Sequence, residues 1–218
     1  MRRPSLALLR MLLAALLFPL IGCGTMLKGQ VTQFHELSPG PKRFVLVLAQ
    51  EQQGSLEFRS YAGLIRSELL SRGWQEVAGA DADVAVFFQA QISQGRSVAF
   101  SYPILGTVPT GSSYTTGTVF SYGNTATINA TTTQGTTVGV TGYGTGTRTE
   151  FDRALQVTMY SAPEFRQTGQ MHRLYEGVIY STGSNGTLAA VMPTLVHALF
   201  DDFPGISGRT RAVTTSIR

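Results

Sequence analysis

The sequence predicts an α+β domain in which two helices pack on one face of a four-stranded sheet. A continuous apolar run at 43–49 and an alternation of apolar and polar residues in three later segments are typical of strands. Two further segments repeat apolar residues every three or four positions, as helices with one buried face do. Their order along the chain, strand, helix, strand, strand, strand, helix, fits two layers around one core.

The first strand is expected at 43–49, because an unbroken apolar run suits a strand that is covered on both faces. A helix follows Ser55, whose hydroxyl can cap its first turn. Its apolar stripe consists of Phe58, Tyr61, Ala62, Ile65 and Leu69. Gly73 closes this helix, and we expect Trp74 to pack back onto the last turn. The second strand is expected at 84–92.

Strands three and four are expected at 150–160 and 171–180, where apolar residues alternate with polar ones. The apolar residues of the second helix are Leu188, Val191, Met192, Leu195, Leu199 and Phe200. Pro193 lies inside this helix, where it removes one backbone hydrogen bond and predicts a bend nearby. Residues 207–218 are interpreted as a polar tail, with a short strand at 211–214 as the alternative.

A segment of different composition, 95–149, is inserted between the second and third strands. Between Asp83 and Glu150 the chain has no Asp, Glu or Lys, and Gly, Ser and Thr predominate. Thr favours extended backbone whereas Gly weakens packing, so we interpret the segment as a β-arm, with a partly disordered loop as the alternative. The arm is expected to turn at Gln134-Gly135. Its candidate partner contacts are Tyr102, Tyr114, Phe120, Tyr122 and Tyr143. Tyrosine in a Ser/Gly background gives a large contact area at low entropic cost.

Residues 1–22 have the three parts of an export signal: basic residues, an apolar run at 11–21 and a small residue before the cleavage point. The run has eleven residues, whereas a membrane-spanning helix needs roughly 20. The run ends in Leu20-Ile21-Gly22-Cys23, which resembles the lipobox of bacterial lipoproteins. This resemblance implies cleavage before Cys23, a diacylglycerol on its sulfur and an N-acyl chain on its amine. An unmodified cysteine after a signal peptide is the alternative.

The lipobox also implies a location. Two or more acyl chains hold a protein stably on a bilayer, which a single chain does not. Gly24 stands where an Asp would act as the lipoprotein family's signal for retention at the inner membrane. We therefore expect an outer-membrane lipoprotein on the periplasmic face. Residues 23–41 would be a lipidated tether and residues 42–206 a single domain, with no cofactor besides the covalent lipid.

The leader accounts for most of the net positive charge. The whole chain has 17 Lys and Arg against 13 Asp and Glu, and without Arg2, Arg3 and Arg10 the basic count falls to 14. A mature chain so close to neutral lacks the basic surface of a nucleic-acid-binding protein, so no nucleic-acid partner is expected. With its one cysteine acylated, the chain has no thiol left for a disulfide.

The sequence contains no recognisable catalytic or metal-binding motif. His35, His172 and His197 lie on three separate segments, and none has a second histidine four residues away. The run Gly-Ser-Asn-Gly at 183–186 is one residue short of a nucleophile elbow. An enzyme needs a nucleophile or a metal together with a positioned acid or base. We therefore predict a protein without catalytic activity and without a metal site.

Four segments resemble small bacterial envelope lipoproteins that carry an uncharacterised α/β module, one of the numbered domains of unknown function. They are the lipobox, Leu69-Leu70-Ser71-Arg72-Gly73-Trp74, Asp81-Ala82-Asp83-Val84-Ala85-Val86, and the end of the second helix from Leu195 to Pro204. The resemblance implies an envelope location and supplies no catalytic residues. The Gly/Thr-rich arm departs from the compact pattern of such modules.

These observations lead to one favoured function and two alternatives. The favoured function is to bind or scaffold an envelope protein or the cell wall through the arm. In the first alternative, Thr/Gly-rich strands pair edge to edge between copies and build a homo-oligomeric structural assembly. In the second and least favoured, the protein hydrolyses cell-wall glycans, which requires paired carboxylates such as Glu150 and Asp152.

Overall fold

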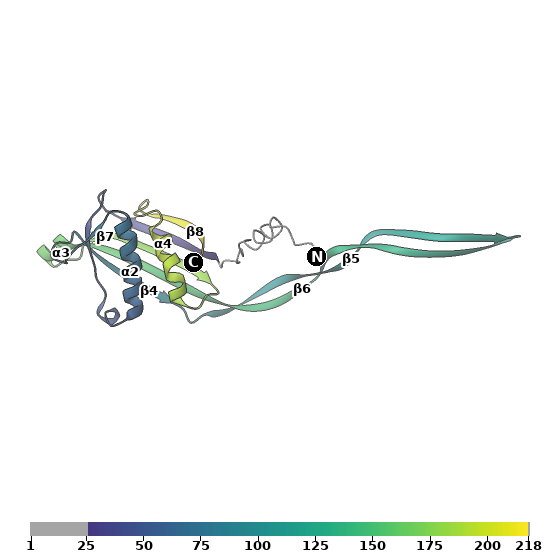
Figure 1. Cartoon of the computed structure of the whole chain (residues 1–218), viewed down its shortest axis with the longest axis horizontal. Coiled ribbons are helices and arrows are strands. Elements are labelled where there is room, and N and C mark those ends of the chain that lie inside the picture. Colours follow the sequence, from purple (N-terminus) through teal and green to yellow (C-terminus); the bar gives the residue numbers. More distant parts are fainter. Residues whose placement is uncertain (1–25, 218) are drawn as a thin grey trace, which may run out of the picture. The chain divides into compact units, whose positions relative to one another are not determined.

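The structure, a computed structural model, describes residues 26–217 and consists mainly of one mixed β-sheet with helices packed on it (Figure 1). The strands lie in the order β3-β2-β4-β6-β7-β1-β8, and β5 pairs with β6 outside this path. The predicted four-stranded sheet with two helices is therefore wrong. The described residues form an eight-stranded sheet and three α-helices.

Strand β2 is parallel to its neighbours β3 and β4, and the other neighbouring strands are antiparallel. The strands are β1 (Met26–His35), β2 (Arg43–Leu46), β3 (Gln75–Glu76), β4 (Val84–Ile92), β5 (Arg96–Tyr122), β6 (Thr125–Ser161), β7 (Arg173–Gly183) and β8 (Arg209–Ser216). The α-helices are α2 (Leu56–Ser71), α3 (Ala162–Thr168) and α4 (Leu188–Phe200), and a short 3-10 turn, η1, spans Gln50–Gln52.

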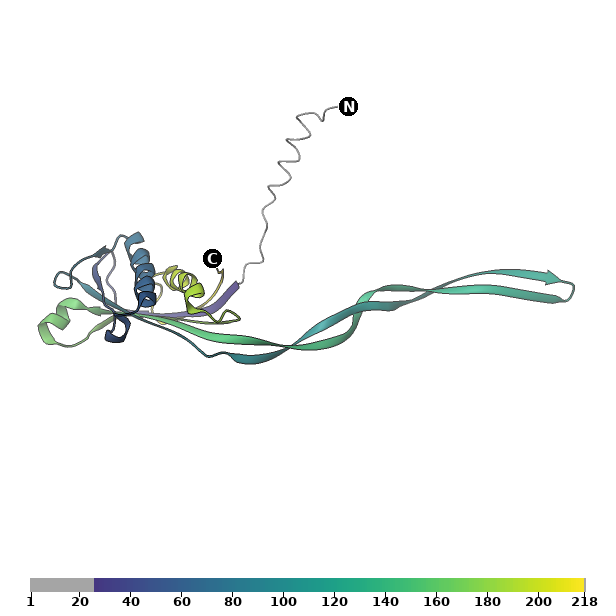
Figure 2. The same cartoon turned by 60° about the horizontal axis from the view of Figure 1, so that its bottom comes forward.

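Helices α2 and α4 lie on the same face of the sheet, and the core is formed between them and the strands (Figures 1 and 2). The predicted first helix is confirmed, and the Ser55 hydroxyl caps it by accepting from the Phe58 amide at 3.3 Å. Trp74 packs into the core as expected, with its ring centroid 6.3 Å from that of Phe44 and 5.7 Å from that of Phe203.

The tether predicted at 23–41 is wrong over residues 26–35, which form strand β1; residues 23–25 lie outside the described residues. Met26–His35 pairs with β7 on one side and β8 on the other. Gly29 occupies an inward position of β1, where a Cβ would lie 2.5 Å from the Tyr180 carbonyl oxygen. The other inward side chains, each at most 3 % exposed, are Leu27, Val31 and Gln33. A glycine and a glutamine on the buried face interrupt the apolar alternation by which a strand is recognised in sequence.

The polar tail predicted at 207–218 is wrong, and its alternative, a short strand at 211–214, is confirmed, because Arg209–Ser216 forms β8 at the edge of the sheet. Its threonines and Val213 are β-branched and suit an extended backbone. The partner of β8 is β1, about 180 positions earlier in the chain. The segment is polar, and it becomes a strand because it forms backbone hydrogen bonds with β1, which is distant in the sequence.

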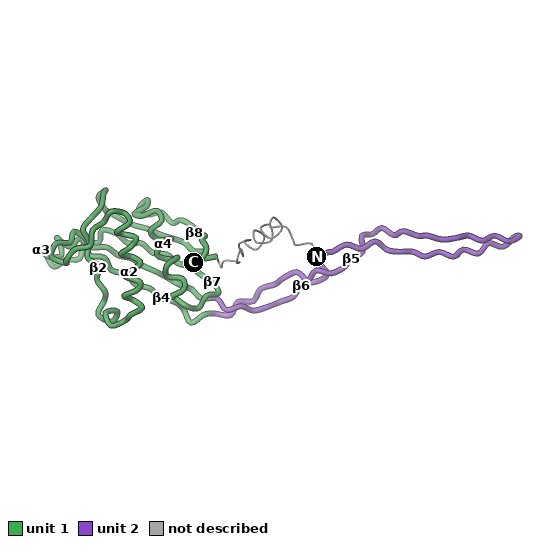
Figure 3. The backbone as a smooth tube through the Cα atoms, in the orientation of Figure 1, with its two compact units in different colours: residues 1–95, 151–218 green, residues 96–150 purple. Residues whose placement is uncertain are grey.

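The described residues divide into two compact units (Figure 3). Residues 96–150 form one unit, which we call the arm, and residues 26–95 and 151–217 form the other, which we call the domain. Strand β6 belongs to both, since it pairs with β5 in the arm and with β4 and β7 in the domain. No helix within residues 26–217 is long and apolar enough to cross a bilayer.

Candidate functional site

The arm is a two-stranded antiparallel hairpin in which β5 and the first part of β6 stay paired, with two shifts of register. The chain reverses at Gly123, whose φ of 63° is one that glycine adopts without strain. The turn predicted at Gln134-Gly135 is wrong. Gln134 lies within β6 opposite Ser113, and Gly135 has no positive φ.

The arm leaves its backbone edges open. Strand β5 has 27 residues, which corresponds to about 90 Å at roughly 3.3 Å per residue. Among the described strands, β5 pairs with β6 alone, and β6 pairs only with β5 before Phe151. No charged residue lies between Arg96 and Arg148. Charged side chains are one of the usual protections of an open edge against pairing with another strand, so this hairpin is unprotected in that respect.

The tip of the arm presents three of the predicted contact residues together. Tyr114, Phe120 and Tyr122 lie in one stretch of unbroken register and are separated by even numbers of residues, so they share one face of the hairpin. They are 70, 69 and 94 % exposed, respectively. We call these residues the tip aromatics. The exposed apolar residues Val119 and Ile128, which the sequence analysis did not single out, face each other on the opposite side.

Glycine makes room for the rings nearer the base of the arm. Tyr102 lies opposite Gly144, and a Cβ at Gly144 would be 2.6 Å from the Tyr102 ring. Phe100 covers Gly146 in the same way, at 2.9 Å. Tyr143 projects from the face opposite to Tyr102, because strand side chains alternate. The two remaining predicted contacts, Tyr102 and Tyr143, therefore do not join the tip aromatics or each other.

Charged residues of the arm gather at its base. The Glu150 carboxylate lies 2.8 Å from Arg148 Nη2 and 3.5 Å from Arg96 Nη2. The Arg148 guanidinium also lies over the Phe100 ring, 5.6 Å from its centroid. In the domain, the Asp152 carboxylate accepts from the Thr182 hydroxyl at 2.7 Å. Each carboxylate of the pair named for glycan hydrolysis is thus engaged with its own partners.

The three histidines lie apart in the domain. His35 is at the end of β1, and His197 on α4 has Nδ1 3.2 Å from the Glu68 carboxylate. His172 precedes β7 and has Nδ1 2.7 Å from the Glu164 carboxylate. Within residues 26–217, no three His, Cys, Asp or Glu side chains are grouped so that they could hold a metal ion.

An apolar pocket of about 440 Å³ lies on the sheet face opposite to α2 and α4, where α3 approaches β4. Its principal lining residues are Val45, Ala85, Phe87, Tyr160, Phe165 and Met171. Phe165 and Met171 are about half exposed. The sequence analysis missed this pocket because its residues come from several segments that are separate in the sequence, among them the short helix α3.

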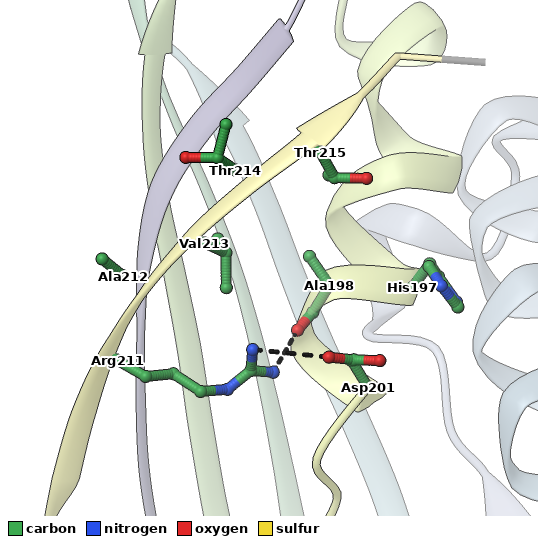
Figure 4. A pocket seen from close by; sticks show the side chains of 8 residues that line it. All are labelled: His197, Ala198, Asp201, Arg211, Ala212, Val213, Thr214 and Thr215. Carbon is green, nitrogen blue, oxygen red and sulfur yellow. Dashed lines mark hydrogen bonds and ion pairs between the residues drawn. The ribbon is translucent and has the colours of Figure 1, made fainter.

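A second pocket, of about 320 Å³, is lined by residues of α4 and the edge strand β8. Figure 4 shows the side chains that line it. Arg211 reaches across it from β8, donates to the Ala198 carbonyl at 2.6 Å and lies 3.7 Å from the Asp201 carboxylate. A cation is favourable at the C-terminal end of a helix, where carbonyl groups carry partial negative charge. Arg211 thereby joins the edge strand to α4.

Comparison with known protein families shows to which family the chain belongs. A family described as a domain of unknown function matches residues 33–205, which is most of the chain and includes the arm. The chain belongs to this family, DUF4136. The predicted resemblance is thereby confirmed as far as the uncharacterised domain is concerned. Cys23 and the lipobox lie outside both the family match and the described residues.

This DUF4136 protein was also compared with curated proteins and with solved structures. None of the curated proteins matches it. Among solved structures, a PDZ domain protein from Parabacteroides distasonis ATCC 8503 is similar, with a TM-score of 0.42 and 12 % identity over 88 % of this chain. The chain spans 40 % of that protein's length.

Replacing Gly144 with valine is expected to loosen the arm locally, because the new side chain would overlap the Tyr102 ring. Amide hydrogen exchange of residues 100–104 should become about tenfold faster, as expected for a local loss of about 1.4 kcal/mol. Gly142→Val is the matched control, since a Cβ at Gly142 meets nothing within 4 Å. Equal exchange rates in the two variants would contradict the packing of Tyr102 on Gly144.

The stability of the domain should depend on the charge of His172. The hydrogen bond and charge of Glu164, and beyond it Glu36, raise the pKa of His172 above its ordinary value of 6.5. A raised pKa means that the folded state binds the proton more tightly. The contribution of protonated His172 to the free energy of unfolding is therefore complete below pH 6.5. It is lost as the pH rises through the folded-state pKa of His172.

The check is an NMR titration of His172 together with urea unfolding of the wild type and His172→Asn between pH 5.5 and 8.5. The stability difference between the two proteins should shrink toward high pH. Glu164→Gln should move the pKa of His172 back toward 6.5. A wild-type His172 that titrates at or below 6.5 would contradict this account.

Proposed function

We propose that this DUF4136 protein is a lipoprotein anchored to the outer membrane on its periplasmic side. In this proposal it catalyses no reaction, and it binds or scaffolds an envelope partner, either a protein or the cell wall, through the arm. The observation that carries the proposal is the exposed face formed by the tip aromatics on a hairpin that has no charged residue between Arg96 and Arg148.

The energetics of the arm favour a bound partner. An isolated two-stranded hairpin is at best marginally stable in water, because it buries little apolar surface. Large aromatic side chains gain most when a partner covers them, and each loses only two rotatable bonds' freedom on binding. A partner that packs on the tip aromatics would add the buried apolar area that the hairpin lacks by itself.

The proposed anchor is supported by the lipobox and by the position of β1. Met26 begins β1 three residues after Cys23. The register places Lys28 opposite Thr182, next to the end of β7. Phe151, where β6 enters the domain, is opposite Gly183 at this same end. Within the domain, the first residues of β1 and the point where β6 begins to pair with β7 therefore lie at the same end of the sheet.

The double variant Phe120→Ser, Tyr122→Ser should lose most of the partner that crosslinking captures in intact cells, by about tenfold or more, because two exposed aromatic anchors typically supply over 1.4 kcal/mol of binding. Tyr180→Ser is the matched control, since Tyr180 is an exposed aromatic residue of the domain. Capture of the same proteins or wall fragments at the same yield by the double variant would remove the tip aromatics as the contact.

The anchor is tested separately with Cys23→Ala. This variant should either keep its leader uncleaved or become soluble, and so should not fractionate as the wild type does, because the attachment site for the lipid is gone. Mass spectrometry of the wild-type N-terminus should show an acylated Cys23. A bare thiol on mature wild-type protein, or unchanged fractionation of the variant, would refute the anchor while leaving the proposed role of the arm intact.

A second candidate function, self-assembly through the arm, is favoured by the open edges of β5 and β6 and by the lack of charge between Arg96 and Arg148. Copies would then extend each hairpin into a wider sheet. Light scattering on the detergent-solubilised full chain should give a multiple of the monomer mass if this is correct. A strict monomer at all concentrations would eliminate it.

A further inference from the structure

The domain contains a buried arginine that lacks an acceptor. Arg153, in β6, is 3 % exposed. In the described part of the chain, neither its Nε nor its Nη1 has a hydrogen-bond partner. Buried guanidinium N–H groups without an acceptor are unfavourable, because they have lost their hydration and formed no hydrogen bond in exchange. Burial accordingly lowers the pKa of Arg153, a shift that the neighbouring Asp152 opposes.

Ser181 lies beside Arg153, and its buried side chain also lacks a hydrogen-bond partner among the described residues. The register of β6 and β7 places the two residues directly opposite each other. Both side chains point to the helix-covered face, because they alternate with the outward residues and share the parity of buried Leu155 and Ile179. Ser181 is 3 % exposed, and its Oγ has no partner among the described residues. Two guanidinium donor atoms and one hydroxyl are thus buried and unsatisfied on adjacent strands.

Two glycines make room for these buried groups. Gly183 follows Ser181 on the same face of β7, and a Cβ at Gly183 would lie 2.5 Å from Arg153 Nη2. Gly29 is opposite Ser181 on β1, and a Cβ there would lie 3.4 Å from the Ser181 Cβ. The guanidinium therefore occupies space that exists only because position 183 has no side chain.

The nearby carboxylate does not serve as the missing partner. Asp152 precedes Arg153 in the strand, so its side chain projects from the opposite face, where it accepts from the Thr182 hydroxyl at 2.7 Å. On the side of Gly183, α4 begins five residues later, and Thr187 at its N-cap accepts no backbone amide.

We propose that Arg153 and Ser181 bind a small oxyanion, a carboxylate or phosphate group, beside Gly183. The anion supplies the acceptors that all three donor atoms lack, and its bonds to the guanidinium are charge-assisted. Because the guanidinium is buried, the ligand is a small diffusing anion or the end group of a slender molecule, not a bilayer surface. This inference is independent of the function proposed for the arm.

Inorganic phosphate is the probe, and the readout is the Tm of the purified full chain at constant ionic strength maintained with sodium chloride. The Tm should rise along a saturating curve, by about 5 °C at a concentration far above the Kd, because a ligand that binds only the folded state stabilises it. A general salting effect of phosphate increases without saturation. A wild-type Tm that is the same in phosphate and chloride would overturn the proposal.

Variants locate the site. Arg153→Met should abolish the saturating rise, and Ser181→Ala should weaken it several-fold. Gly183→Ala should also weaken it, because its methyl group takes the space of Arg153 Nη2. Arg59→Met is the matched control: it removes the same charge from an exposed position on α2 and should respond as the wild type does. If Arg153→Met does not fold, the phosphate response of Ser181→Ala and Gly183→Ala tests the proposal. A Tm that rises with phosphate in both variants as it does in the wild type would overturn the proposal.

Discussion

The pairing of β6 is the constraint on which the rest of the structure depends. In the domain β6 is hydrogen-bonded to β4 on one side and β7 on the other, so its register fixes which side chains meet α2 and α4. Leu155, Val157 and Met159 form the inward series and are fully buried. A slip of one residue would turn this series outward. The same parity places Arg153 inward, so the core series itself forces a cationic side chain into the buried face.

The arm obeys a different rule, because it has no core of its own. Its rings lie on the opposite strand where glycine leaves space, as Tyr102 does on Gly144 and Phe100 on Gly146. Such pairs recover some apolar contact within a ribbon of two strands. The cost is that glycine adds no side-chain packing and weakens the strand. The tip aromatics have threonine, not glycine, as their cross-strand neighbours and stay exposed.

The sequence predicts the elements whose determinants are local, and it does not predict those that depend on pairing between distant segments. Helix α2 was predictable because its cap at Ser55 and its apolar stripe are local. Strand β1 was not, since Gly29 and Gln33 break its inward alternation. Strand β8 was indicated only as a short alternative at 211–214, since threonine dominates it. Both become strands by pairing across the chain's full length. The Gly/Thr composition predicted an extended arm, but its turn is decided by positive φ at Gly123, which composition does not specify. Arg153 could have been found, because it falls on the parity of Leu155 and Val157.

The start of β1 has a consequence for how far the protein can move. Met26 lies three positions after Cys23, and a fully extended chain spans no more than about 11 Å over three positions. If Cys23 carries the proposed lipid, only a very short linker connects the lipid to the folded domain. It would then be held against the membrane it is attached to, with restricted freedom to tumble or to search the space beyond. Encounters with partners would take place within a thin layer at that surface.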